Sequence, residues 1–149
     1  CPLPHFYWNG MISHQIWGRT PGEVLVDANW RNNGHEYVVV DESREVFRAE
    51  LIATGMGPMS HLVFSPDGEW MLADTYPQDG VQALALVKVK TGEFKVIGRF
   101  KHQQPKTYPV DVRCDLHPRW SRDGQLITID SIDDGKRGIY LTSLNDVCF

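Results

Sequence analysis

Short apolar runs recur along the chain, and turns that contain glycine separate them. EVLVDA, WMLADTY and LITIDS each follow a Pro-Gly or Asp-Gly step, which favours a tight turn because glycine tolerates positive φ. A second set of runs follows at EYVVVDE, ALALVKV and GIYLTSL, and a third at EVFRAEL and FKVIGRF. No segment carries a helical stripe of useful length. The pattern therefore predicts an all-β fold of short strands.

Three segments repeat the same residue types in register. They read SHQIWGRTPGEVLVDAN from Ser13, SHLVFSPDGEWMLADTY from Ser60 and LHPRWSRDGQLITIDSI from Leu116. Each has a histidine, an aromatic residue three positions later and an aspartate thirteen positions after the histidine. These are His14, His61 and His117, then Trp17, Phe64 and Trp120, then Asp27, Asp74 and Asp130.

Repeats of about 40 to 50 residues with four strands each are typical of β-propeller blades. The spacing predicts about three four-stranded antiparallel blades, approximately at residues 11–51, 60–100 and 115–149. Propellers close with about four to eight blades, and the last predicted blade stops after its third strand. Either HFYWNGMI supplies the missing strand, or the chain is part of a larger propeller, or several copies assemble. The larger propeller is favoured, because an open arc of blades leaves sheet faces and edges uncovered.

Composition narrows the function classes. With 149 residues and 42% apolar residues, the chain can form one domain with a core. A net charge of −4 gives no overall field that favours nucleic acid, and no apolar run reaches the roughly 18 residues of a membrane helix. No signal peptide is visible at the start. Of the three cysteines, Cys1 and Cys148 pair if the chain ends meet, which leaves Cys114 as a free thiol or a ligand.

Two groups of phrases resemble known families. FSPDG and HPRWSRDG resemble the TolB-type, WD-like propeller repeats of bacterial proteins. ADTYP at 73–77 and RCDLHPRWSRDGQLITIDS at 113–131 resemble the propeller proteins related to oligogalacturonate lyases and to propeller-type ulvan lyases. The chain lacks the Gln-x-x-His-x-His metal motif of oligogalacturonate lyases.

The resemblance implies a carbohydrate-active propeller in the periplasm or outside the cell. Its expected activity is that of a polysaccharide or oligosaccharide lyase, which cleaves uronic-acid glycosides by β-elimination. Its partner would then be an acidic oligosaccharide or polysaccharide, with no nucleic acid and no membrane span. Two alternatives remain: a non-catalytic TolB-like propeller that binds protein or glycan, and a structural module of an extracellular assembly.

The repeat histidines are the first candidates for chemistry. Residues at equivalent positions of successive blades face a shared pocket at the propeller axis. Cys114-x-x-His117 has a spacing that suits a metal ligand pair, and His61 from the previous blade completes a predicted site for Zn²⁺ or Mn²⁺. Asp115 or His14 is a further ligand candidate. The alternative is that these histidines only hydrogen-bond within each blade, and that Cys114 is a small buried residue.

Arg113 is the preferred partner for a substrate carboxylate, because a guanidinium binds carboxylates in bidentate fashion. Arg119 and Arg122 are interpreted as solvated turn residues. The resemblance to ulvan lyases implies histidine and tyrosine as base and acid. It makes His14 and His35 candidates for proton transfer, with Tyr76 preferred over Tyr108 as their partner.

The repeat aspartates are predicted to be structural, with carboxylates that accept backbone N–H bonds at each blade corner. Trp17, Phe64 and Trp120 are predicted to lie in the core. Gly55-x-Gly57 lacks the third glycine and the following helix of a phosphate loop, and no Gly-x-Ser-x-Gly elbow is present. Nucleotide binding and serine hydrolysis therefore have no support.

Overall fold

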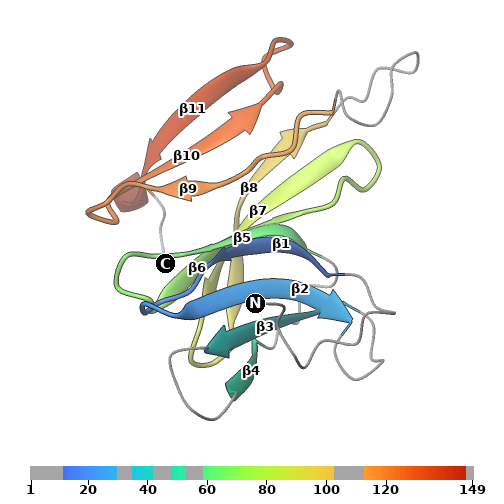
Figure 1. The fold of residues 1–149 in the computed structure, drawn as a ribbon. Coiled ribbons are helices and arrows are strands. Elements are labelled where there is room, and N and C mark those ends of the chain that lie inside the picture. Colours follow the sequence, from blue (N-terminus) through green and yellow to red (C-terminus); the bar gives the residue numbers. More distant parts are fainter. Residues whose placement is uncertain (1–11, 30–34, 42–47, 53–58, 103–112, 147–149) are drawn as a thin grey trace. The chain divides into compact units, whose positions relative to one another are not determined.

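The computed structural model describes residues 12–29, 35–41, 48–52, 59–102 and 113–146 (Figure 1). These residues form three antiparallel sheets and one short 3₁₀ helix, Leu144–Asp146. The expected all-β fold with blade-like sheets is confirmed. The chain divides into two compact units, Cys1–Thr54 and Gly55–Phe149, which are described separately.

The first unit contains one four-stranded sheet. Its strands lie in sequence order and are β1 (Ile12–Trp17), β2 (Glu23–Asn29), β3 (His35–Asp41) and β4 (Arg48–Ile52). β-branched residues suit a pleated and buried surface, and the valines of β2 and β3 form the core here: Val26, Val38 and Val40, together with Ala28.

Trp17 departs from its predicted place in the core. It lies on β1 and is 80% exposed in the structure. Trp120, at the equivalent position of the third repeat, packs partly buried against a core and donates its indole N–H to the carbonyl of Val63. Phe64, from the second repeat, is buried as predicted.

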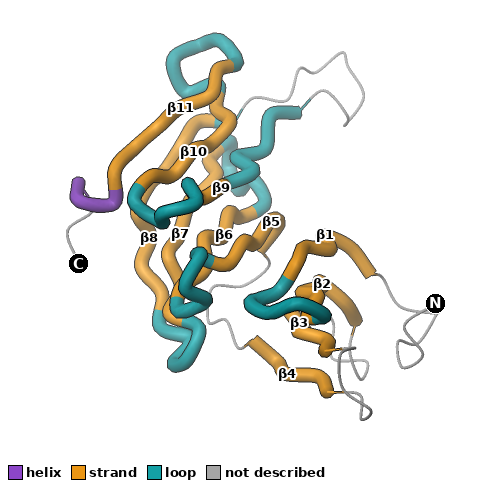
Figure 2. The backbone as a smooth tube through the Cα atoms, turned by 60° about the vertical axis from the view of Figure 1, so that its left-hand side comes forward, coloured by secondary structure: helices purple, strands orange, loops and turns teal. Residues whose placement is uncertain are grey.

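The second unit contains two sheets that share a core (Figure 2). The first has the order β5 (Met59–Phe64), β6 (Trp70–Thr75), β7 (Val81–Lys88) and β8 (Phe94–Lys101). The second has the order β11 (Gly138–Ser143), β10 (Leu126–Ser131) and β9 (Arg119–Trp120). Leu84 and Leu86 of β7 pack with Leu116 and with Ile127 and Ile129 of β10. This apolar contact fixes the segment before β9 against the end of β7.

Two equivalent turns enter β6 and β10. In the first, the Ser65 hydroxyl and the Glu69 N–H both donate to Oδ1 of Asp67, and Gly68 takes a φ of 72° that side chains other than glycine rarely adopt. Ser121, Asp123 and Gly124 repeat this arrangement. The predicted Asp-Gly turns are confirmed.

These turns make stability depend on pH. The Ser65 hydroxyl and the Glu69 N–H lower the pKa of Asp67 from its ordinary 3.8, because they bind the ionised carboxylate. Its contribution is therefore complete above the unfolded pKa and is lost as pH falls through the lower folded pKa. Asp67→Asn keeps the acceptor oxygen but cannot titrate. We expect urea unfolding of the variant and the wild type to converge below about pH 4. Parallel stability profiles across that range would contradict this expectation.

Candidate metal centre

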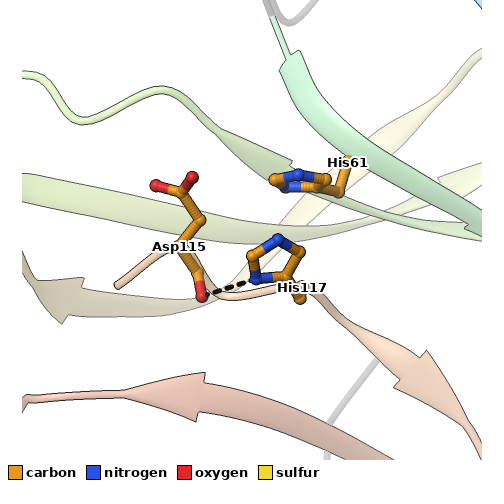
Figure 3. A group of neighbouring side chains, drawn as sticks. All are labelled: His61, Asp115 and His117. Carbon is orange, nitrogen blue, oxygen red and sulfur yellow. Dashed lines mark hydrogen bonds between the residues drawn. The ribbon is translucent and has the colours of Figure 1, made fainter. Parts of the chain in front are cut away.

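Three side chains of the second unit gather at one end of its two sheets (Figure 3). His61 comes from β5, and Asp115 and His117 come from the segment that leads into β9. One ligand atom of each residue lies within 4.8 Å of those of the other two. The two imidazole centroids are 4.0 Å apart, with the ring planes inclined by 40°.

Asp74, on β6, positions both histidines. Its carboxylate is fully buried, and Oδ1 accepts the backbone N–H of His61 at 2.6 Å. Oδ2 accepts the backbone N–H of His117, in the segment that leads into the next sheet, at 3.1 Å. The predicted role of the repeat aspartates as acceptors of backbone N–H bonds is confirmed at this position.

Local backbone irregularities place His61 and His117 outside the regular hydrogen-bond pattern of the strands. The register of β5 against β6 shifts between Met59 and Leu62, so His61 lies in a bulge. His117 has a φ of 41°, in the left-handed region that non-glycine residues rarely occupy. Bulges and such backbone angles are common beside functional sites.

Hydrogen bonds favour one tautomer of each imidazole. Nδ1 of His61 lies 3.2 Å from Oδ2 of Asp74, and Nδ1 of His117 lies 3.1 Å from the backbone carbonyl of Asp115. The Ser60 hydroxyl, 3.1 Å from the same Nδ1 of His61, can donate or accept. The carboxylate and the carbonyl only accept, so they favour the tautomer with the hydrogen on each Nδ1 and the lone pair on each Nε2. This is the arrangement in which histidines ligate metals in proteins.

Asp115 is held by two donors. Its side chain is largely buried; Oδ2 accepts from Nε of Arg113 at 2.6 Å, and Oδ1 accepts from Nε2 of Gln82 at 3.2 Å. Arg113 also lies over the ring of Tyr76, with Cζ 5.9 Å from the ring centroid. Since the contact with Asp115 uses Nε, the two Nη groups of Arg113 carry the donors that suit an external carboxylate.

Cys114, the predicted thiolate ligand, lies outside this cluster. Neighbouring residues of an extended segment point to opposite sides, so Asp115 and His117 share one side while Cys114 and Leu116 are buried on the other. Burial raises the pKa of the Cys114 thiol; Arg137 opposes this change, and Asp130 and Asp115 add to it. Burial therefore disfavours the thiolate form that a metal binds.

The other predicted residues lie elsewhere or beyond the described part of the chain. In the first unit, Nδ1 of His14 lies 3.6 Å from Oδ2 of Asp27, which repeats the pairing of His61 with Asp74. His35 begins β3, and its side chain is outside the described residues, as is Tyr108. Proton transfer by His14 and His35 stays a prediction. The predicted pair Cys1 and Cys148 also lies outside the described residues.

The sequence patterns gave no prediction for Gln82, and they gave Asp115 only as a further ligand candidate. Gln82 is 1% exposed and stands in the otherwise apolar run VQALALV of β7. A polar residue within a fully buried strand is the signal that would have found it, since such groups are kept only where they are hydrogen-bonded.

Comparison with solved structures identifies the fold. An oligogalacturonate lyase in complex with manganese matches with a TM-score of 0.69 at 19% identity, over 93% of this chain and 36% of that one. TolB from Acinetobacter baumannii matches with a TM-score of 0.70 at 18% identity, over 93% of this chain and 31% of that one. An oligogalacturonate lyase from Vibrio parahaemolyticus gives 0.65 at 18% identity, over 91% and 36%.

No family model and no curated protein sequence matches this chain. The chain spans about a third of the length of the matched structures. Within the described residues, no helix has the length and apolar character needed to cross a bilayer. The expected similarity to TolB and oligogalacturonate lyase propellers is confirmed, and the three sheets are blades of a β-propeller fold.

Proposed function

We propose that His61, Asp115 and His117 bind a divalent cation, with Mn²⁺ the first candidate and Zn²⁺ the second. The observation that carries the proposal is the convergence of two imidazoles and one carboxylate within 4.8 Å, with both Nδ1 atoms engaged behind the site. Imidazole and carboxylate together suit both ions. Support comes from the manganese complex of an oligogalacturonate lyase that shares the fold.

We further propose that the site acts on glycans that contain uronic acids. A bound cation would supply positive charge beside the carboxylate of the sugar. Arg113 would bind that carboxylate through its Nη groups, and Tyr76 under the guanidinium would limit its motion. In β-elimination a base removes the proton at C5, the bond between C4 and the glycosidic oxygen breaks, a C4–C5 double bond forms, and the departing oxygen gains a proton. Tyr76, which lies beside Arg113 in the same unit, is the candidate for one of these proton transfers.

The test of activity follows the unsaturated product. We expect incubation with oligogalacturonate and Mn²⁺ to produce ultraviolet absorbance from the new double bond. Arg113→Lys keeps the positive charge but loses the planar guanidinium that binds a carboxylate through two N–H groups. We expect it to reduce the rate of product formation by about 100-fold. The matched control is Arg122→Lys in the exposed turn, which should leave the rate unchanged. No product from any uronate polymer, or full activity of Arg113→Lys, would contradict the lyase proposal.

A non-catalytic binding protein is the second candidate function. The TM-score of 0.70 with TolB is equal in practice to the 0.69 with the lyase, so the shared fold supports this candidate as much as the lyase. Retention of an acidic glycan or of a protein without any product would select this alternative. For either function we propose a periplasmic or extracellular location, which cell fractionation would test.

The partners proposed for the third sheet are further blades. Asp74 pairs with Leu84 and Leu72 with Leu86, while Asp130 pairs with Ile139 and Thr128 with Leu141. Ile139 and Leu141 thus occupy the positions of Leu84 and Leu86. Leu84 and Leu86 are each only 2% exposed, because the following sheet covers them. Ile139 and Leu141 are 75% and 65% exposed. A further sheet of the same repeat would cover this face.

A chain extended after Ser143 by a second copy of residues 89–149 tests this arrangement. The copy supplies an equivalent of β8 and a further sheet like β9–β11. We expect hydrogen exchange of the β11 amides to slow by about tenfold or more. Ile139→Ser with Leu141→Ser should abolish the gain while changing the unextended chain by less than about 0.5 kcal/mol. Unchanged exchange of β11 in the extended chain would contradict docking at this face.

A further inference from the structure

Two buried side chains lie directly behind Asp115. Gln82 is 1% exposed and His102 is 7% exposed. Gln82 pairs across the sheet with Phe100, and the backbone N–H of His102 donates to the carbonyl of Gly80. Gln82 and His102 are therefore diagonal neighbours on one face, at a separation that long side chains bridge.

Each side chain uses its N–H group to hold the segment that carries Asp115. Nε2 of Gln82 donates to Oδ1 of Asp115 at 3.2 Å and faces the Thr75 carbonyl at 3.4 Å. Two acceptors around one end of the amide fix that end as the nitrogen. Nδ1 of His102 lies 3.3 Å from the Cys114 carbonyl, so it carries the hydrogen of the neutral ring.

The atoms that remain are both acceptors. Oε1 of Gln82 and Nε2 of His102 are buried, and neither has a hydrogen-bond partner among the described residues. A buried acceptor without a donor is costly, and native proteins satisfy such groups, with an ordered water where no side chain serves. A small molecule that donates two hydrogen bonds would satisfy both acceptors behind residues 113–117.

We propose that one buried water molecule bridges Oε1 of Gln82 and Nε2 of His102 and forms part of the support of the candidate site. A water donates two hydrogens, which matches the two acceptors, and it needs no counter-charge. The bridge would link the two side chains whose N–H groups hold Asp115 and the Cys114 carbonyl, in the segment that also carries Arg113 and His117.

A crystal structure of the full chain that resolves ordered solvent tests the bridge directly. We expect one water within hydrogen-bonding distance of both atoms in the wild type, and none in Gln82→Met or His102→Phe. Absence of density beside both atoms, separate waters on each, or metal density would overturn the proposal.

Energetic coupling gives a second test. If one water serves both side chains, Gln82→Met and His102→Phe should be non-additive, with a discrepancy of about tenfold in the unfolding equilibrium constant. Hydrogen exchange of the β6 and β7 amides measures that constant. Additive effects would overturn the bridge.

The consequence for ligand binding rests on the proposed metal site. Gln82→Met removes a donor from Asp115 and should weaken Mn²⁺ binding by about tenfold, a change that a purely structural role would not cause. Failure of the wild type to bind Mn²⁺ would overturn the metal proposal. It would not affect the proposed water, which the crystal structure tests separately. Unchanged Mn²⁺ affinity in Gln82→Met would overturn the supporting role.

Discussion

Replacing Asp74 by alanine is expected to lower the free energy of unfolding of the second unit by about 3 kcal/mol or more. The fully buried carboxylate accepts the backbone N–H groups of His61 and His117 and lies within hydrogen-bonding distance of Nδ1 of His61. Its removal leaves the backbone N–H groups of His61 and His117 without this acceptor, and a buried donor left unpaired costs about 1–3 kcal/mol. Chemical unfolding followed by hydrogen exchange of β6 and β10 measures the loss.

Asp130→Ala is the matched control, because Asp130 occupies the same repeat position. Its carboxylate faces only the exposed Arg119 at 3.4 Å and Nδ1 of His117 at 3.7 Å, and no backbone N–H among the described residues is assigned to it. Surface ion pairs contribute little, so we expect a loss below about 1 kcal/mol. Equal losses from the two substitutions would show that Asp74 does not join the two sheets.

Replacing a predicted metal ligand is expected to have the second large effect. His61→Gln, Asp115→Asn and His117→Gln should each weaken Mn²⁺ binding by about 100-fold or more, because each removes a direct ligand. Isothermal titration calorimetry with Mn²⁺ measures the affinity. Asp74→Asn should weaken it by about 10- to 100-fold through the orientation of His61.

Two variants separate this site from its neighbours. Cys114→Ala should leave the Mn²⁺ affinity unchanged, since the buried thiol lies outside the cluster. Asp123→Asn changes an exposed turn carboxylate and serves as the control for Asp115→Asn. A loss of affinity in Cys114→Ala as large as that in Asp115→Asn would restore the thiolate as a ligand and contradict the His–Asp–His set.

The fold could be predicted from the sequence because it depends on local signals that repeat. Each Asp-Gly turn forms in a few residues, and alternation of apolar and polar positions sets which face is buried. The pairing of a histidine with the aspartate thirteen residues later also follows from the repeat, since the antiparallel pairing of β5 with β6 brings His61 and Asp74 together. Trp17 was misplaced because burial depends on a neighbouring sheet rather than on the residue type.

The cluster of His61, Asp115 and His117 was predicted only in part, for a different reason. His61 and His117 came from the repeat, but the choice between Cys114 and Asp115 depends on which side of an extended segment faces the site. Spacing alone does not reveal that side. Gln82 and His102 contact this segment from strands that precede it by many residues, and no periodic pattern links such partners.

The most direct measurement of the central claim is anomalous diffraction from crystals soaked in Mn²⁺. The proposed site predicts one anomalous peak in the second unit, at a bonding distance of about 2.0–2.3 Å from Nε2 of His61, Nε2 of His117 and a carboxylate oxygen of Asp115. A peak that contacts Cys114 instead, or full Mn²⁺ occupancy elsewhere with none between these three side chains, would contradict it.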